Sequence, residues 1–365
     1  MDFSPEDRER AARYHGPLYW AALVRLLLVA LVYTACTAVD REPFGWLAAS
    51  ALGATFVTMA ATLVCLPLDF WRGYVRERRW GFSTQSLGGW LSDRAKGTAI
   101  AVAIGALAWT ILIALTRAFP SRWPLAAAAA AAAAVLLLSF VAPVVLEPLF
   151  NRFRPLEDER LAGELRSLAE RAGVPVRDVL VADASKRTAK TNAYVSGIGP
   201  TRRVVVWDTL LDGASERELK LVVAHELGHR RERHVLKGTL LAMVGAAAGV
   251  LLLWAVLGLP RPSDYPRAAL LFLALELAGL PLGAWVSRRW ERAADRFSLE
   301  LTDDRDAFVG AHVALARSNL SDLEPPRVVY LLLFTHPTPP ERLALADVKG
   351  RQNLREPGVH STHAG

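Results

Sequence analysis

The sequence predicts a mainly α-helical, multi-pass membrane protein with about six transmembrane helices and a small α+β insert. Three observations lead to this fold class. Hydrophobic residues make up 52% of the 365 residues, which is more than an ordinary soluble domain contains. Six separate segments are each long and apolar enough to cross a bilayer as a helix. Between the fourth and the fifth of them lies a polar stretch with the patterns of short strands and helices.

The apolar segments are each predicted to form one transmembrane helix. They cover residues 18–38, 46–70, 98–116, 125–146, 238–259 and 268–287. The first contains Arg25, which a membrane tolerates when the guanidinium faces protein or reaches the headgroups. The fourth contains a run of alanines, whose small side chains favour helix formation and close helix packing. One such segment could be a buried helix of a soluble protein, but six together favour the membrane.

The positive charges predict which side of the membrane each loop faces, because cytoplasmic loops carry an excess of lysine and arginine. The segment before the first span and the loop after the second are rich in these residues: Arg8, Arg10, Arg13, Arg72, Arg76, Arg78, Arg79, Arg94 and Lys96. The loops after the first, third and fifth spans hold only one or two each. With alternating spans, residues 147–237 and the tail after 288 then face the cytoplasm.

Composition also limits the partners. The net charge of +7 comes from basic residues that gather beside apolar runs, which indicates contact with the anionic headgroups of a lipid bilayer. No nucleic-acid-binding motif is found, so no nucleic-acid partner is expected. Cys36 and Cys65 lie in apolar segments and are predicted to be small core residues, not a disulfide. The highly charged residues 1–16 do not fit a cleavable signal peptide.

The stretch between the fourth and fifth spans is predicted to be a small mixed domain. A helix is expected over 156–172, ending at Gly173. Strands are expected at 179–182, 192–197 and 203–207. Ser215 and Glu218 have the spacing of a capping box, which predicts a second helix that starts there and runs almost directly into the fifth span.

That second helix carries the motif His225-Glu226-Leu227-Gly228-His229. Histidines at i and i+4 lie on one face of a helix, one turn apart, and can bind a single cation. Glu226 can reach a water on that cation, and this HExxH spacing is typical of zinc peptidases. A surface helix with two solvated histidines is the simpler alternative. The nearby fifth span places the expected zinc site at or just inside the cytoplasmic membrane face.

A catalytic zinc ion needs a third protein ligand and one open position. His234 is nearest in sequence, but it lies only five residues after His229 on the same predicted helix, and the metzincin spacing is not matched. Glu291 is on a separate predicted helix, with Asp295 one turn further along. Glu291 could bind zinc while Asp295 orients a ligand histidine. A solvated acidic pair at the membrane edge would have the same spacing.

Several further stretches carry a resemblance to a known family. With the HExxH motif, they are Leu66–Phe70, Tyr74–Leu87, Glu147–Asn151, Pro155–Glu157, Asn192–Gly197, Glu291–Asp295 and His336–Arg342. In this order they resemble the CAAX prenyl protease 1 family, which consists of integral-membrane zinc metalloendopeptidases. The resemblance covers most of the chain, and a composition rich in arginine and alanine suggests a bacterial member. Eukaryotic members have seven spans around a water-filled chamber, whereas six are predicted here.

The resemblance implies a single zinc ion per chain with a water-activating base beside it. Zinc would be held by His225, His229 and Glu291, with Glu226 as the general base. Asp295 would orient a ligand histidine from behind.

The resemblance also implies substrate contacts away from the metal. Asn192, Ala193 and Tyr194 would belong to an edge strand that pairs with an extended peptide. His336 and Arg342 would lie near the substrate carbonyl, where either could stabilise the oxyanion. An exposed loop histidine and a surface arginine are the alternative for that last pair.

The chain is interpreted as five regions. They are residues 1–146 with four spans, 147–236 as the soluble zinc-peptidase insert, 237–300 with two spans and Glu291, 301–349 as a C-terminal helical segment, and 350–365 as a disordered tail.

The predicted function is a membrane-embedded zinc endopeptidase. It would cut peptides or membrane-associated proteins, including membrane-anchored ones, at the cytoplasmic face of a bacterial cell membrane. A quality-control protease for misfolded membrane proteins is an alternative with the same chemistry. A metal-binding membrane scaffold or transporter is a rival. A structural zinc site would have no use for Glu226. Only Arg25 and Glu276 lie well inside the spans, away from their ends, which is few for a transporter.

Overall fold

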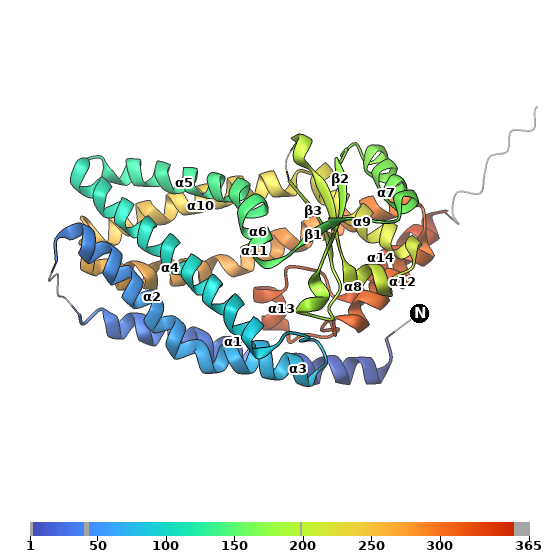
Figure 1. The fold of residues 1–365 in the computed structure, drawn as a ribbon, viewed down its shortest axis with the longest axis horizontal. Helices are drawn as coiled ribbons and strands as arrows, with labels where there is room; N and C mark the ends of the chain where they lie inside the picture. Colours follow the sequence, from blue (N-terminus) through green and yellow to red (C-terminus); the bar gives the residue numbers. More distant parts are fainter. Residues whose placement is uncertain (1–2, 40–43, 198, 354–365) are drawn as a thin grey trace, which may run out of the picture.

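The computed structural model describes residues 3–39, 44–197 and 199–353, and helices dominate it (Figure 1). By length and composition, six helical runs in the described residues can cross a membrane. They match the six predicted spans: Pro5–Cys36, Trp46–Arg79, Leu87–Ala118, Trp123–Phe150, His234–Leu257 and Pro262–Thr302. Four runs contain the predicted span in full, whereas the first and the fifth each end two residues earlier than predicted. The predicted fold class is therefore confirmed.

The long runs are built from α1 (Pro5–Cys36), α2 (Trp46–Phe70), α4 (Leu87–Ala118), α5 (Trp123–Val141), α10 (His234–Leu257) and α11 (Tyr265–Thr302). Two of them continue through a π-helical turn into a short helix. These continuations are η1 (Trp71–Arg76) with α3 (Glu77–Arg79), and η2 (Ala142–Leu146) with α6 (Glu147–Phe150). The 3₁₀ turn η5 (Pro262–Asp264) precedes α11.

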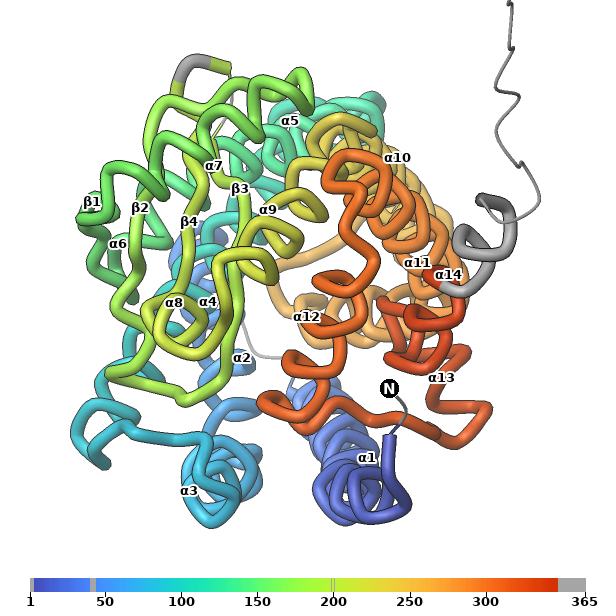
Figure 2. The backbone as a smooth tube through the Cα atoms, turned by 90° about the vertical axis from the view of Figure 1, so that its right-hand side faces the viewer, coloured from blue at the N-terminus to red at the C-terminus, as the bar shows by residue number. Residues whose placement is uncertain are grey.

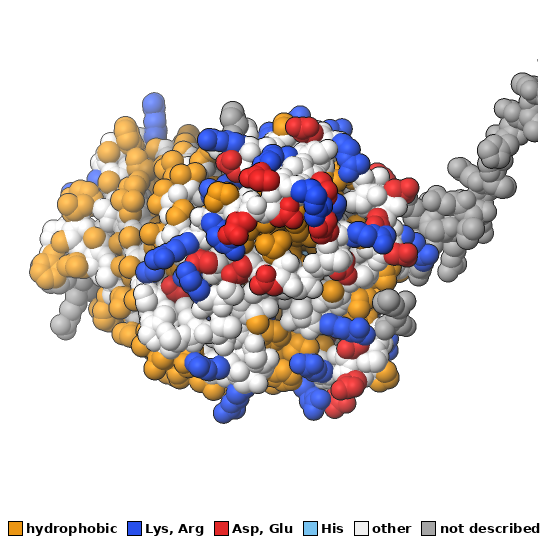
Figure 3. Space-filling view, turned by 45° about the vertical axis from the view of Figure 1, so that its right-hand side comes forward, with side chains coloured by type: hydrophobic (Ala, Val, Ile, Leu, Met, Phe, Trp, Pro, Cys, Tyr) orange, Lys and Arg blue, Asp and Glu red, His pale blue; other side chains and the backbone are white. Residues whose placement is uncertain are grey.

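The outer surface of the long helices is apolar. Large exposed side chains occur along them, including Leu27, Leu63, Leu107 and Val244. Figure 3 shows hydrophobic side chains gathered over this half of the molecule and charged side chains over the other half. So large an apolar surface is unfavourable in water. It is compatible with lipid, because an α-helix satisfies its backbone hydrogen bonds internally. The chain is an integral membrane protein.

Small residues let the long helices approach one another closely. Ala127 of α5 shares a buried cluster with Val250 of α10, and these two helices run side by side. Ala54 of α2 packs with Trp109 of α4. Trp109 Nε1 also donates a hydrogen bond to the Pro262 carbonyl at 3.0 Å, which ties α4 to the turn before α11.

The soluble part between α6 and α10 contains one sheet. Its strands are β1 (Phe153–Pro155), β2 (Asp178–Ala182), β3 (Ala193–Ser196) and β4 (Arg203–Trp207), in the order β1-β2-β4-β3. β2 and β4 are parallel, whereas the other two pairs are antiparallel. β3 is therefore an edge strand. β2, β3 and β4 lie where the sequence predicts strands, but β1 is missed because three residues ending in proline carry almost no strand signal.

Two helices pack on this sheet and form the main soluble core with it. α7 (Glu159–Arg171) ends just before Gly173, which has a φ of +68°, as the sequence predicts. α9 (Glu216–Arg231) begins with the predicted capping box between Ser215 and Glu218. Smaller elements complete the insert: η3 (Ala184–Lys186), η4 (Gly199–Thr201) and α8 (Asp208–Gly213).

The polar segments gather at one end of the long helices (Figures 1 and 2). The C-terminal helices α12 (Arg305–Ser318), α13 (Arg327–Leu333) and α14 (Pro339–Asn353) lie there. The start of α1 packs against α12, with Phe3 and Val313 in one cluster. The loop after α3 joins the insert through a bridge between Ser83 and Thr188. These are the segments that the charge pattern assigns to one side of the membrane.

Two smaller expectations can also be compared with the structure. Cys36 and Cys65 are free, and Cys65 is buried, so the prediction that they form no disulfide is confirmed. The predicted disordered tail starts at 350, whereas α14 continues to Asn353. Residues 354–365 lie outside the described part of the chain.

Candidate active site

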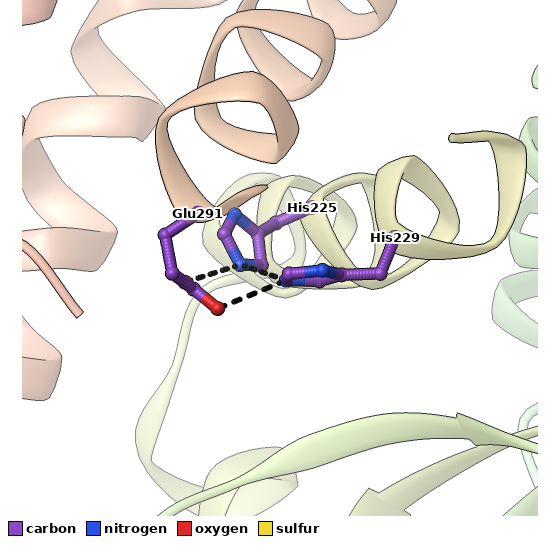
Figure 4. Close-up of side chains that lie close together, drawn as sticks. All are labelled: His225, His229 and Glu291. Carbon is purple, nitrogen blue, oxygen red and sulfur yellow. Dashed lines mark hydrogen bonds and ion pairs between the residues drawn. The ribbon is translucent and has the colours of Figure 1, made fainter. Parts of the chain in front are cut away.

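Two histidines and one carboxylate converge where α9 packs on α11 (Figure 4). His225 and His229 come from successive turns of α9, and Glu291 comes from α11. The two histidine Nε2 atoms lie 3.2 Å apart. The Glu291 oxygens lie 3.3 Å from Nε2 of His225 and 3.2 Å from Nε2 of His229. The structure thus brings together the three residues that the sequence names as possible metal ligands.

These atoms fit a tetrahedral metal ion. Ligand atoms about 2.0–2.1 Å from a zinc ion lie about 3.3 Å from one another in a tetrahedron, and the three observed separations agree with that. Glu291 Oε2 is buried and makes no hydrogen bond among the described residues. A buried carboxylate facing two imidazole nitrogens needs a cation to compensate its desolvation. Three protein ligands also leave one position open, which is typical of catalytic sites.

Asp295 holds His225 from behind. His225 Nδ1 lies 2.8 Å from Asp295 Oδ1, so the ring donates there and its Nε2 lone pair points toward the metal position. Asp295 is fully buried, and the Arg342 guanidinium binds both of its oxygens, with Nε 2.9 Å from Oδ2. The sequence alone cannot tell the two acidic residues apart. In the structure Glu291 faces Nε2 of the histidines, whereas Asp295 faces Nδ1 of one of them.

His229 also has a partner, which sequence reasoning missed. Its Nδ1 lies 3.0 Å from Nδ1 of His234, so one ring donates to the other. His234 is buried and stacks on Trp290, with ring centroids 5.0 Å apart. The chain turns sharply between α9 and α10 at Arg233, which has a φ of 56°. No sequence signal predicts that turn, which places His234 behind His229 and not among the ligands.

The close approach of α9 and α11 depends on Gly228, inside the HExxH motif. A Cβ atom there would lie 3.1 Å from the ring of Phe297 and 3.2 Å from the Cα of Ala294, both on α11. Real Cβ atoms rarely come so close to other atoms. The absence of a side chain at 228 therefore allows Glu291 and Asp295 to reach the histidines.

A cavity of about 450 Å³ opens beside the metal ligands. Glu226, one residue after the first ligand, lines it together with Asn192, Ala193, His336 and Arg342. Burial raises the pKa of the Glu226 carboxyl above its ordinary value, which makes its carboxylate a stronger base. The cavity therefore joins the metal position, a base and a strand edge.

The outer edge of β3 forms one wall of this cavity. In an antiparallel ladder, alternate residues direct their backbone groups toward the neighbouring strand and away from it. Trp207 N–H donates to the Asn192 carbonyl at 3.0 Å. In the observed register, the backbone groups of Thr191, Ala193 and Val195 therefore point away from β4.

Side chains occupy two of these three outward positions. The Asn319 carboxamide accepts from Thr191 N–H at 3.0 Å and donates to the Thr191 carbonyl at 3.2 Å. Arg230 donates to the Val195 carbonyl. Between them, the backbone of Ala193 has no partner among the described residues. An extended peptide can therefore pair with the chain at Ala193.

Of the other residues predicted to contact substrate, His336 and Arg342 line the cavity and Tyr194 does not. His336 lies at the cavity with its Nε2 3.3 Å from Glu291 Oε1, and its side chain is 58% exposed. Arg342 lines the same cavity but is engaged with Asp295. The Tyr194 hydroxyl donates to Glu147 at 3.4 Å, and Tyr194 does not line the cavity.

Two more residues at the site have no sequence signal. Asn319 caps the strand edge, as described above. His312 is buried on α12, with its Nε2 3.5 Å from Asp295 Oδ1. His312 lies on a helix that carries no recognisable motif and Asn319 directly follows that helix, so only the fold could reveal them.

Two family models of known proteins match this chain, one over the part that contains the metal site and one over the first four long helical runs. A family model described as "Peptidase family M48" matches residues 155–349. A second one, "CAAX prenyl protease N-terminal, five membrane helices", matches residues 14–152. The described residues of that region hold four span-length helical runs, so this chain differs from the description in the number of helices.

Two curated relatives and one solved structure illustrate the similarity. The metalloprotease YhfN of Bacillus subtilis is 33% identical over 320 residues, which cover 84% of this chain and 74% of the relative. CAAX prenyl protease 1 of Saccharomyces cerevisiae is 35% identical over 176 residues, covering 48% of this chain and 39% of the relative. The crystal structure of S. mikatae Ste24p shares the fold, with a TM-score of 0.79 at 24% identity, over 94% of this chain and 89% of that one.

The geometry predicts different roles for the two acidic residues of α11. Glu291→Ala should leave two histidines and lose the metal on mild dialysis. Asp295→Asn keeps an acceptor oxygen near His225, so it should weaken metal affinity only about 10–100-fold. Metal content after dialysis, measured for both variants, checks this. Loss of metal from the Asp295 variant with full metal in the Glu291 variant would reverse the assignment.

Proposed function

The chain belongs to peptidase family M48 and is a membrane-embedded metallopeptidase, and we propose that zinc is its metal and that it cuts peptides or membrane-anchored proteins. The observation that carries this proposal is the convergence of His225, His229 and Glu291 beside Glu226, in a cavity bounded by an open strand edge. One zinc ion per chain fits the three ligands. A metal-binding scaffold or transporter would need neither the base nor the strand edge.

The residues around the metal position would act in successive steps of peptide hydrolysis. Zinc held by the three ligands would supply Lewis acidity to a water and to the substrate carbonyl. Glu226 takes a proton from the attacking water, whose oxygen forms the new bond to the carbonyl carbon. Glu226 then gives that proton to the amide nitrogen as the C–N bond breaks. Asp295 keeps His225 in the tautomer that ligation requires.

Negative charge develops on the carbonyl oxygen in the transition state, and a donor beside it lowers the barrier. His336 is suited to that role because its Nε2 already lies within 3.3 Å of Glu291 and its ring is exposed at the cavity. Arg342 adds positive charge to the same wall while it holds Asp295. We assign the direct contact to His336 and a supporting electrostatic role to Arg342.

The substrate would bind as an added strand along β3. Pairing with backbone groups is independent of side-chain identity, so the scissile bond can be positioned beside the metal in many sequences. Asn192 and Ala193 line the cavity at that edge, and Tyr194 supports it through Glu147. Several relatives are named CAAX prenyl proteases. From these names we carry over a membrane-anchored substrate, and not the prenyl group.

We place the site at the cytoplasmic face of a bacterial cell membrane. The charge pattern of the loops supports this orientation, and the polar segments lie at one end of the long helices. The division into a four-span region, an insert, a two-span region, a C-terminal helical segment and a tail remains our proposal for the domain organisation.

Removing the base tests the proposed chemistry directly. Glu226→Gln should lower the rate of peptide hydrolysis by about 10²–10⁴-fold, while metal content stays near that of the wild type because Glu226 is not a ligand. Cleavage of a fluorogenic peptide library and metal analysis measure both quantities. Glu232→Gln, six residues further on, is the matched control and should keep full activity. A Glu226 variant with most of its activity would contradict the mechanism.

The strand edge can be tested by removing one donor. Ala193→Pro deletes an N–H that β4 does not use, so the sheet should remain intact, and kcat/KM should fall about tenfold or more. Ala193→Gly keeps the N–H and should lose much less. Steady-state kinetics of both variants give the answer, and equal kcat/KM values would exclude pairing at this edge.

Orientation is tested by single cysteines in a Cys36→Ala, Cys65→Ala background. A cysteine at Ser83 should resist a membrane-impermeant thiol reagent in intact cells, because the loop after α3 is cytoplasmic in the proposal. A cysteine at Ser263, in the turn before α11, should react. The reverse labelling pattern would overturn the orientation.

A further inference from the structure

A second cavity lies where the ends of three helices meet, and the proposed hydrolysis does not use it. It has a volume of about 530 Å³ and lies between the end of α5, the last turn of α9 and the first turn of α10. His229 lines it, so it adjoins the metal site. α5 and α10 are both candidate membrane spans, which places this cavity at the boundary between the apolar and polar halves of the molecule.

The polar part of the cavity is strongly cationic. Its described lining includes Arg202, Arg230, Arg231 and Arg233 and contains no carboxylate. Among the described residues, none of the four pairs with an acidic side chain. Within the described part of the chain, the side chains of Arg230 and Arg231 donate only to main-chain carbonyls, of Val195 and Ala172. These bonds satisfy hydrogen-bond donors but do not neutralise the positive charge.

These positive charges also repel one another. Two of the side chains, Arg202 and Arg233, have no hydrogen-bond partner among the described residues. A cluster of like charges in a cavity that no described carboxylate lines raises the local potential, and an anion bound among them would relieve it.

Large apolar side chains from the two candidate spans line another part of the cavity. Leu136 and Phe140 come from the end of α5, and Val235 and Leu236 come from the start of α10. All four side chains are exposed. The cavity therefore presents a cationic region next to an apolar region. At a membrane surface, the headgroup of an anionic amphiphile could contact the first while its acyl chains contact the second.

We propose that this cavity binds the phosphate group of an anionic phospholipid, with the acyl chains along Leu136, Phe140 and Leu236. Arginines bind phosphate with paired, charge-assisted hydrogen bonds, and basic pockets between membrane helices are suited to anionic headgroups. The bound lipid would brace the junction of α9 and α10 at Arg233, next to the turn that carries His229. The inference does not depend on the proposed peptidase activity.

Lipid retention tests the proposal without any activity assay. The full chain is placed in nanodiscs of phosphatidylcholine with or without phosphatidylglycerol, extracted gently, and examined by native mass spectrometry and thermal unfolding. The wild type should retain phosphatidylglycerol and unfold at a higher temperature when it is present. The double variant Arg202→Gln, Arg233→Gln should weaken retention about thirtyfold, which corresponds to about 1 kcal/mol for each arginine removed from an anionic headgroup.

Two further double variants keep the test specific. Arg202→Lys with Arg233→Lys retains the charge and should retain most of the lipid. Arg166→Gln with Arg177→Gln removes the same charge from the surface of the insert and should behave as the wild type. Equal retention by the wild type and the double glutamine variant at 202 and 233 would overturn the proposal, and so would equal losses in the test and control variants.

A last experiment distinguishes binding of a phospholipid from binding of a free anion. Detergent-purified protein is titrated with inorganic phosphate and, separately, with short-chain phosphatidylglycerol. The lipid should raise the unfolding temperature more than phosphate does, because it also covers the apolar side chains. Stabilisation by phosphate that equals that of the lipid would mean a site for free anions and would overturn the assignment to phospholipid.

Discussion

The contact between α9 and α11 is the interaction on which the site depends. Gly228 allows the helices to approach, and Glu291 and Asp295 then reach opposite nitrogens of His225. Asp295 is fully buried, and burying its charge without partners would cost free energy of folding. His225 of α9 and Arg342 of α14 compensate its charge, so the metal position, α9 and α14 form one connected set. A change that separates α9 from α11 would disturb all three together.

The same two helices connect the soluble part to the membrane. α11 is one continuous helix from the turn before it, through the apolar span, to Glu291 and Asp295. α9 leads through a sharp turn at Arg233 into α10. Glu291 thus lies in the polar end of a helix that can span the membrane, and the two histidines lie on α9, which directly precedes another such helix. A substrate that is itself held in the membrane would need to travel little to reach the metal site.

The edge of β3 beside the cavity is open over a short stretch only. Asn319 and Arg230 occupy the backbone groups on either side of Ala193. The unpaired stretch is therefore short, which protects the edge from pairing with other chains and leaves the backbone of Ala193 free among the described residues. Asn319, which occupies the backbone groups at one end of this stretch, directly follows α12 and is far from β3 in sequence. Edge and metal are held together by the packing of the C-terminal helices and not by the strand itself.

The sequence by itself determined the parts of this protein that are local. Apolar length specifies the six spans, capping residues specify where α7 and α9 begin or end, and the HExxH spacing puts His225 and His229 on one helix face, because each follows from neighbouring residues. The resemblance to a family suggested which distant residues would join them. Only the tertiary structure decided that Glu291 faces the metal position while Asp295 lies behind His225. It alone placed His234, His312 and Asn319 at the site, because these contacts join helices that meet only after the chain has folded.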